Sequence, residues 1–388
     1  MLKLSRLDKE KSVPCYKILN RMKYVNEYRD EELAQSYLKK IKDIASRQWN
    51  IMEVCGGQTH SLVKNGILDL LPNEVNMIHG PGCPVCVTPI HLIDKAIYLA
   101  EEKGVTLCSY GDMLRVPGSS RSLLDAKAQG ADVRILYSPL EAVTLAQQNP
   151  EKEFVFFAVG FETTAPANAM SVVQAKQMGV KNYSILTSHV LVPPAIEAVM
   201  NDEDSLIHGF LAAGHVCTIM GISEYGPLTE KYKIPIVVTG FEPVDLLQGI
   251  YMTVKQLESG KHVLENQYSR VVQAKGNIKA IEMINEVFNV QDRVWRGIGS
   301  IPESGYEVKD EYEAYNANIK FNVQIVEAEE NKSCIAGQVL KGIKKPFECP
   351  EFGKKCKPEF PLGAPMVSSE GACAAYYHFN RATETISA

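Results

Sequence analysis

The 388-residue sequence has little surplus charge of either sign. Its 41 Lys and Arg residues stand against 46 Asp and Glu residues, which gives a formal net charge of -5. No cluster of Lys and Arg provides the basic track that a nucleic-acid backbone requires. We therefore expect no nucleic-acid partner.

Long apolar runs are also scarce. The N-terminal stretch MLKLSRLDKEKS mixes both charge signs and lacks the apolar core of a secretory signal. Residues 205–223 carry no charged side chain, but they contain histidines and glycines and are interpreted as buried interior, not as a membrane span. The expectation is a cytoplasmic protein without a membrane partner.

The common nucleotide-binding fingerprints are missing, because neither GxGxxG nor GxxxxGK[ST] occurs. A dinucleotide-dependent enzyme is therefore disfavoured. The chain does contain ten cysteines. In a protein without a secretory signal, this number favours metal or redox chemistry over a framework of disulfides.

From residue 49 onward, short apolar runs that end in glycine-rich turns alternate with amphipathic stretches. The runs include IMEV, VNMI, VTLCSY, VRILY, FVFFAVG, YSILTS, GFLAAG and IPIVVTG. This alternation is typical of βαβ units, so the expected fold class is α/β with parallel sheets.

The length and the changes in pattern predict several segments. Residues 28–47 have acidic residues early and basic residues late, as an α-helix prefers. Near residues 149–150 a predicted helix ends and a strand begins, which suggests a domain boundary. The expected segments are an N-terminal helical segment (1–48), a first α/β domain (49–150), a second α/β domain (151–260) and a helical, cysteine-rich region (261–388).

Four cysteines lie close together in sequence near the C-terminus, with gaps of 14, 6 and 16 residues. They are Cys334, Cys349, Cys356 and Cys373. Thiolates are soft ligands that suit an iron-sulfur cluster or zinc, although this spacing matches neither the compact ferredoxin run nor paired CxxC zinc ribbons. Unligated buried thiols and structural disulfides are the alternatives.

Cys83 and Cys86 form a CxxC motif in the loop GPGCPVCVTP. Thr88 and Pro89 are placed to begin the next helix, whose N-terminus lowers the pKa of nearby thiols. The motif alone indicates a redox-active dithiol, half of a metal site, or a structural pair.

Cys55 ends an apolar strand and opens the loop CGGQTH. Its two glycines expose backbone N–H groups, which form a nest for an anionic ligand such as iron carrying cyanide. His60 is a candidate proton shuttle or supporting partner. The alternative is a turn cysteine in an ordinary capping loop, with His60 merely solvated.

Further candidates lie at predicted strand ends, where α/β proteins often carry functional residues. Glu162 in GFETTAP is the stronger of two acidic candidates, and Glu242 in GFEP is the weaker. His189, His215 and Cys217 are interpreted as core or loop residues without an assigned role.

Five motifs in this order resemble the HypD family of hydrogenase maturation proteins: EVCGGQTH, GPGCPVCVTP, GFETTAP, GFEPVDLLQGI and the Cys-x14-Cys-x6-Cys-x16-Cys tail. The resemblance spans nearly the whole chain. It implies two related α/β domains and a C-terminal region organised around a 4Fe-4S cluster. The implied ligands of that cluster are Cys334, Cys349, Cys356 and Cys373.

The same resemblance implies roles for the other motifs. Cys55 would bind a transient iron with cyanide and carbon monoxide ligands, together with a cysteine of the small partner HypC. Cys83 and Cys86 would form a redox-active pair, and His60 and Glu162 would be functional residues. HypE would deliver the cyanide, with HypF upstream.

Two other functions remain open from the residues themselves. In a stand-alone thiol-disulfide oxidoreductase, Cys83 and Cys86 would act on a diffusible substrate and the cluster would supply electrons. In a structural adaptor, the metal would only order the C-terminal region, and Cys55 would carry no chemistry. Whether the chain is an enzyme in the strict sense is left open.

Overall fold

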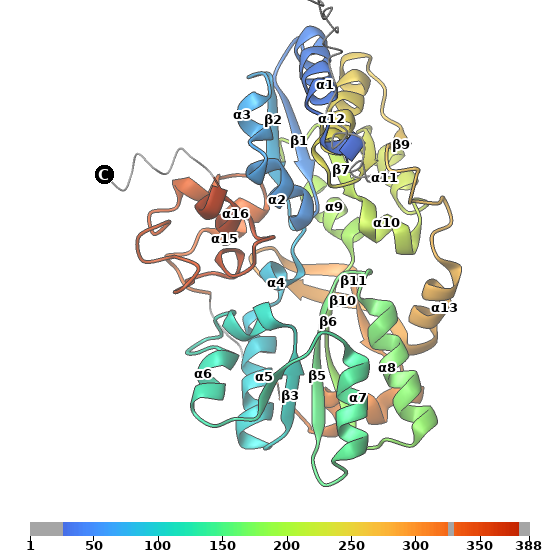
Figure 1. The fold of residues 1–388 in the computed structure, drawn as a ribbon, viewed down its shortest axis with the longest axis vertical. Helices are drawn as coiled ribbons and strands as arrows, with labels where there is room; N and C mark the ends of the chain where they lie inside the picture. Colours follow the sequence, from blue (N-terminus) through green and yellow to red (C-terminus); the bar gives the residue numbers. More distant parts are fainter. Residues whose placement is uncertain (1–25, 325–329, 380–388) are drawn as a thin grey trace, which may run out of the picture.

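The computed structural model describes residues 26–324 and 330–379. Two α/β lobes lie one above the other, and a β-hairpin lies between them (Figure 1). The C-terminal segment packs against the side of the upper lobe (Figure 1). Residues 1–25 of the predicted N-terminal helical segment lie outside the described residues.

The upper lobe contains a five-stranded parallel sheet in the order β2-β1-β7-β8-β9. Successive residues of its central strands point to opposite faces, as Ile51 and Met52 do, and each face has its own apolar cluster. The strands are β1 (Trp49–Glu53), β2 (Val75–His79), β7 (Gly209–Ala213), β8 (Ile236–Thr239) and β9 (Leu264–Asn266).

Helices cover both faces of this sheet, which is why its central strands β7 and β8 are buried along their whole length. The helix predicted at 28–47 is confirmed as α1, capped by Asp30, whose carboxylate accepts a hydrogen bond from Leu33 N–H at 2.9 Å. The helices are α1 (Glu31–Ile44), α2 (Gly56–Lys64), α3 (Ile67–Leu70), α9 (Val192–Met200), α10 (Gly214–Met220), α11 (Tyr225–Tyr232) and α12 (Pro243–Glu258).

The lower lobe contains a four-stranded parallel sheet in the order β4-β3-β5-β6. Every residue of its two longest strands is buried, with an apolar cluster on each face. The elements are β3 (Thr106–Ser109), β4 (Val133–Ile135), β5 (Phe154–Gly160), β6 (Tyr183–His189), α5 (Ile90–Glu102), α6 (Leu123–Ala128), α7 (Pro139–Gln148) and α8 (Ala165–Met178).

The parallel α/β class is confirmed, but the two sheets do not follow the predicted segments 49–150 and 151–260. The boundary predicted near residue 150 falls inside the lower sheet, where β3 pairs with β5 through Leu107 and Val155. The chain builds β1 and β2, crosses to the lower lobe for β3 to β6, and returns for β7 to β9. A βαβ rhythm shows that strands are parallel, but it does not show which sheet each strand joins.

The remaining elements lie between and beside the lobes. An antiparallel hairpin lies between the lobes, and the C-terminal helix α16 packs on α2 of the upper lobe. Irregular loops connect these elements. The helices and strands are α4 (Pro84–Val87), α13 (Ile278–Val287), β10 (Phe288–Trp295), β11 (Gly299–Val308), α14 (Ala317–Lys320), α15 (Ala336–Leu340) and α16 (Ala372–Phe379). Short 3-10 turns lie at Asn26–Arg29, Gly111–Arg115, Asp310–Tyr315, Pro346–Glu348 and Ala364–Met366.

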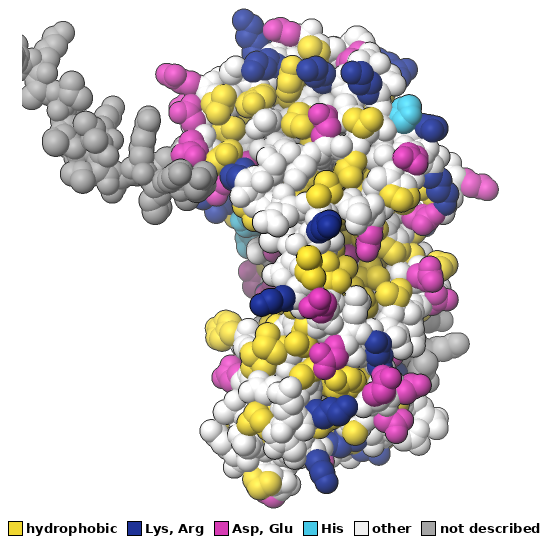
Figure 2. Space-filling view, turned by 90° about the vertical axis from the view of Figure 1, so that its right-hand side faces the viewer, with side chains coloured by type: hydrophobic (Ala, Val, Ile, Leu, Met, Phe, Trp, Pro, Cys, Tyr) yellow, Lys and Arg dark blue, Asp and Glu magenta, His cyan; other side chains and the backbone are white. Residues whose placement is uncertain are grey.

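The surface agrees with the balanced composition. Acidic and basic side chains are interspersed over the face drawn in Figure 2. Within the described ranges, no helix is both long enough and apolar enough to cross a lipid bilayer.

Candidate functional site

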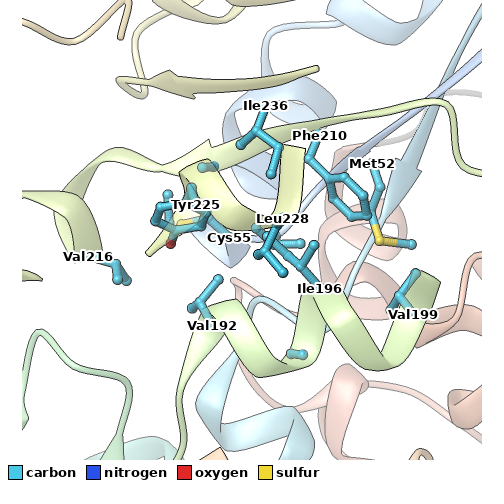
Figure 3. Close-up of a cluster of buried hydrophobic side chains, with 14 of the residues drawn as sticks. Met52, Cys55, Val192, Ile196, Val199, Phe210, Val216, Tyr225, Leu228 and Ile236 are labelled. Carbon is cyan, nitrogen blue, oxygen red and sulfur yellow. The ribbon is translucent and has the colours of Figure 1, made fainter. Parts of the chain in front are cut away.

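Cys55 lies at the junction between β1 and α2, where it is the N-cap residue of the helix. Its side chain is buried within the apolar cluster that also contains Met52, Phe210 and Ile196 (Figure 3). Burial raises the pKa of the Cys55 thiol well above its usual range, and the nearby Glu370 and Glu53 add to the rise. The thiol therefore stays protonated until a cation binds it.

Several groups around the Cys55 sulfur favour the thiolate. The backbone N–H groups of Gln58 and Gly57 act to lower the pKa of the Cys55 thiol, as expected at the start of a helix. His215 Nδ1 lies 3.5 Å from the sulfur, and burial lowers the pKa of His215 to about 4. At neutral pH the imidazole is therefore uncharged, so its ring nitrogen can accept a hydrogen bond from the thiol.

The loops CGGQTH and GPGCPVC contact each other through glycines. Gly56 N–H donates a hydrogen bond to the carbonyl of Gly82 at 2.8 Å. A Cβ atom on Gly82 would overlap the backbone nitrogen and Cα of Cys55. This close approach therefore requires glycine at position 82.

Cys83 and Cys86 are joined by a disulfide, with their Cα atoms 5.2 Å apart. The helix predicted to begin at Pro89, with Thr88 as its N-cap, begins one residue later in the structure. Pro84 begins a short helix of its own, α4, with Cys83 as N-cap, and α5 follows after Pro89. Both cysteines are buried, with 3% and 1% exposure.

A cleft of about 560 Å³ brings together residues from five separate segments, one of which is the turn at residues 110–113. The CPVC loop, the GFETT loop after β5, His215 of α10 and the turn before α16 all contribute. The lining residues are Gly82, Pro84, Val85, Tyr110, Gly111, Asp112, Met113, Val159, Gly160, Phe161, Thr163, Thr164, His215, Ser368, Ser369 and Glu370. The first two motifs and the start of GFETTAP therefore lie at or beside one cleft.

A buried polar network contacts the CGGQTH loop. Glu53 accepts hydrogen bonds from Cys55 N–H at 3.0 Å and from the Thr59 hydroxyl. His79 Nδ1 lies 2.7 Å from the Glu53 carboxylate, and its Nε2 lies 3.0 Å from the Tyr376 hydroxyl. The network connects the ends of β1 and β2 to α16. No sequence motif predicts a role for these residues, although Glu53 and His79 lie at strand ends.

His60 points to the C-terminal region. Its Nδ1–H donates a hydrogen bond to the carbonyl of Ser369 at 3.0 Å, and its ring meets Phe379 edge-on at 5.1 Å. His60 therefore ties α2 to α16. Among the described residues, the histidine in contact with the Cys55 sulfur is His215.

The four late cysteines are gathered in the C-terminal region. Burial raises the pKa of the Cys373 thiol well above its usual range, and repulsion from the other three thiolates adds to the rise. The region itself is stabilised by a small apolar cluster that includes Val63 of α2 and Tyr376 of α16. The four thiols are Cys334, Cys349, Cys356 and Cys373.

The surroundings of these thiols fit an iron-sulfur cluster. Backbone N–H groups point at the sulfurs, as that of Leu362 does toward Cys356 at 3.4 Å, and such bonds are characteristic of cluster sites. A Cβ atom on Gly363 would overlap the sulfur of Cys334. In residues 26–324 and 330–379, no three His, Cys, Asp or Glu side chains surround one point as the ligands of a single metal ion do.

Glu162 lies behind the cleft, among buried residues. One carboxylate oxygen accepts a hydrogen bond from Val192 N–H at 2.9 Å, at the start of α9, and the other is buried without a hydrogen-bond partner. Burial raises the pKa of Glu162 to about 8, and Glu224 adds to the rise. Cys217 and Tyr225 lie close enough for the Glu162 charge to raise the pKa of each.

The raised pKa of Glu162 predicts a pH-dependent stability. Its folded pKa lies above the unfolded value, so the stabilisation is fully present below about pH 4.3 and is lost as pH rises through about 8. Each unit of pKa difference corresponds to about 1.4 kcal/mol. Between these pH limits we expect the free energy of unfolding of the wild type to fall by a few kcal/mol more than that of Glu162→Gln.

Urea unfolding at several pH values checks this expectation. Glu197→Gln is the matched control, because Glu197 is a partly exposed carboxylate at the other end of α9 that pairs with Lys231. The expectation fails if the Glu162→Gln variant loses stability with pH as steeply as the wild type does.

The fold and the site define a class of protein: a two-lobed α/β protein in which a buried thiol, a disulfide and a four-cysteine region converge. The family model for HypD, described as "Hydrogenase formation hypA family", matches residues 32–380. The chain belongs to the HypD family of hydrogenase maturation factors.

Curated relatives match over almost their whole lengths. Hydrogenase maturation factor HypD of Azotobacter vinelandii is 46% identical over 374 residues, which cover 94% of this chain and 99% of the relative. Hydrogenase expression/formation protein HupD of Azotobacter chroococcum is 47% identical over 93% of this chain and 97% of the relative. HypD of Escherichia coli K12 is 43% identical, with 93% and 99% covered.

Proposed function

We propose that the chain is a cytoplasmic iron-sulfur scaffold of nickel-iron hydrogenase maturation. It assembles an iron carrying cyanide and carbon monoxide, together with the small partner HypC, and receives cyanide through HypE and HypF. The observation that carries the proposal is the meeting of three cysteine groups: Gly82 of the CPVC loop contacts Cys55, and Glu370, near Cys373, packs on Gly56.

Cys55 would bind the iron through its sulfur. A coordinated thiol is deprotonated, and His215 Nδ1, 3.5 Å from the sulfur, would pass the released proton on, because its low pKa keeps the ring uncharged. The backbone N–H groups of Gly57 and Gln58 would then stabilise the thiolate. The buried surroundings disfavour an isolated thiolate, so Cys55 would be deprotonated when its sulfur is bonded to the iron.

Cys334, Cys349, Cys356 and Cys373 would hold a 4Fe-4S cluster, which supplies electrons one at a time when bound. Backbone N–H groups of residues 336, 362 and 363 would stabilise its sulfur ligands. Cys83 and Cys86 would form the redox pair: two electrons and two protons convert the disulfide into two thiols.

A stand-alone thiol-disulfide oxidoreductase is the second candidate, and the disulfide itself favours it. An exchange enzyme has to present a sulfur to its substrate. Burial of both Cys83 and Cys86 disfavours direct exchange with a protein disulfide. This function also gives Cys55 no role.

Replacing Cys55 distinguishes these functions. The chain and a HypC-like partner are co-expressed and purified without oxygen, and iron, sulfide and dithiol exchange are measured. The scaffold predicts that Cys55→Ala loses the iron held in excess of the cluster but keeps the cluster. Preserved dithiol turnover in a wild type without excess iron would favour the oxidoreductase instead. Cys217→Ala, another buried thiol of the same apolar cluster, is the matched control.

A further inference from the structure

The tip of the β10–β11 hairpin contacts the cleft motifs and the cysteine region. Trp295 is fully buried, its ring lies 6.0 Å from that of Phe161 in the GFETT loop, and its Nε1–H donates to the Ser304 hydroxyl at 2.9 Å. The indole therefore fixes the hairpin against the GFETT loop. The next residues, Arg296 and Gly297, extend from this anchor toward the cysteines.

Arg296 is tied to the CPVC helix through its backbone. Its N–H donates a hydrogen bond to the carbonyl of Val87, the last residue of α4, at 2.7 Å. Its guanidinium donates to the carbonyl of Pro117 at 3.1 Å and pairs with Glu330 at 3.0 Å. The Arg296 side chain is only 4% exposed, whereas that of Glu330 is 46% exposed.

Gly297 brings the hairpin tip against the four-cysteine region. A Cβ atom on Gly297 would lie 2.8 Å from the Cα of Gly337, and one on Gly337 would lie 2.5 Å from the carbonyl oxygen of Gly297. Gly337 belongs to α15, which begins just after Cys334. Burial raises the pKa of the Cys334 thiol, and the charge of Arg296 opposes that rise.

We infer that Arg296 is a positioning residue that holds a buried positive charge beside the cluster ligand Cys334 and makes the cluster easier to reduce. This inference rests on the proposed function. Adding an electron to a cluster adds negative charge, and a nearby cation favours that state. A guanidinium remains charged at any relevant pH, and burial protects its field from salt screening. The exposed Glu330 offsets part of this effect.

The same residue links the cluster region to the dithiol. The backbone of Arg296 is bonded to α4, and its side chain lines the same pocket as Leu362, whose N–H donates to the Cys356 sulfur. A displacement of α4, such as opening of the Cys83–Cys86 disulfide could cause, would therefore move the guanidinium relative to Cys334.

The test is a redox titration of the cluster in the full chain, followed by electron paramagnetic resonance. Arg296→Gln removes the charge and is expected to lower the midpoint potential. Arg296→Lys keeps the charge and is expected to stay near the wild type. Glu330→Gln is expected to shift the potential the opposite way, by a smaller amount. Arg121→Gln is the control, because Arg121 lines the same pocket as Arg296 but pairs with Glu101.

Iron and sulfide content and the melting temperature are measured for every variant. If Arg296→Gln binds the cluster and keeps the wild-type midpoint potential, the inference is wrong and the proposed function still stands. Equal shifts of the midpoint potential in Arg296→Lys and Arg296→Gln would have the same meaning. If Arg296→Gln fails to load, the absence of an upward shift in Glu330→Gln decides against the inference. A wild type without iron and sulfide would overturn the proposed function as well.

Discussion

Cys373→Ala is expected to leave the C-terminal region without its cluster and to lower the stability of the chain. Cys373 lies in the first turn of α16, close enough to the other three cysteines for their charges to raise the pKa of its thiol, as expected of ligands of one centre. Iron and sulfide should fall to near zero, because metal binding to such a region is coupled to its folding. Elemental analysis and thermal unfolding of anaerobically purified protein measure both effects.

The matched control is Cys108→Ala. Cys108 is fully buried in β3 of the lower lobe, far along the chain from the C-terminal region. Its removal costs apolar packing but leaves all four predicted ligands in place. If the Cys373→Ala protein kept full iron and sulfide, the assignment of Cys373 as a cluster ligand would be wrong.

Gly82→Ala is expected to separate the two cysteine loops and to abolish binding of the iron unit. The added methyl group would overlap the backbone of Cys55, which cannot move aside because its N–H is bonded to Glu53. Forcing an extra carbon into such a site costs about 1–3 kcal/mol or more. We expect a lower melting temperature and loss of the excess iron, with the cluster retained.

Gly226→Ala is the control for this variant. Gly226 lies in α11, and an added Cβ there would meet no atom within 4 Å, so alanine should be neutral or slightly stabilising. Wild-type iron binding by Gly82→Ala would show that contact between the loops is not required. Loss of iron in both glycine variants would point to a general effect on folding.

The alternation of strands and helices could be predicted from the sequence, because strands buried on both faces are continuously apolar and end in glycine-rich turns. Sheet membership could not. A strand such as β3 has the same local pattern whichever sheet it joins, and the two crossings between lobes leave no mark in that pattern. The split near residue 150 therefore separated β3 from its neighbour β5.

The candidate site was predictable where one loop carries it, and not where distant segments meet. Cys55, at the end of β1, and the CPVC loop could be located from local motifs. His215, whose ring contacts the Cys55 sulfur, lies 160 residues further along the chain. Tyr376 lies 297 residues from His79. These contacts depend on tertiary packing, and Arg296 belongs to no motif that spacing could single out.

The most direct test of the proposed function is infrared spectroscopy of the chain purified without oxygen together with the proposed HypC-like partner. The account predicts stretching bands of iron-bound cyanide and carbon monoxide in the wild type and in Cys217→Ala. It predicts no such bands in Cys55→Ala, although the cluster and the partner remain bound. Bands that persist in Cys55→Ala, or a cluster-loaded wild type that never shows them, would contradict the claim that Cys55 holds the iron.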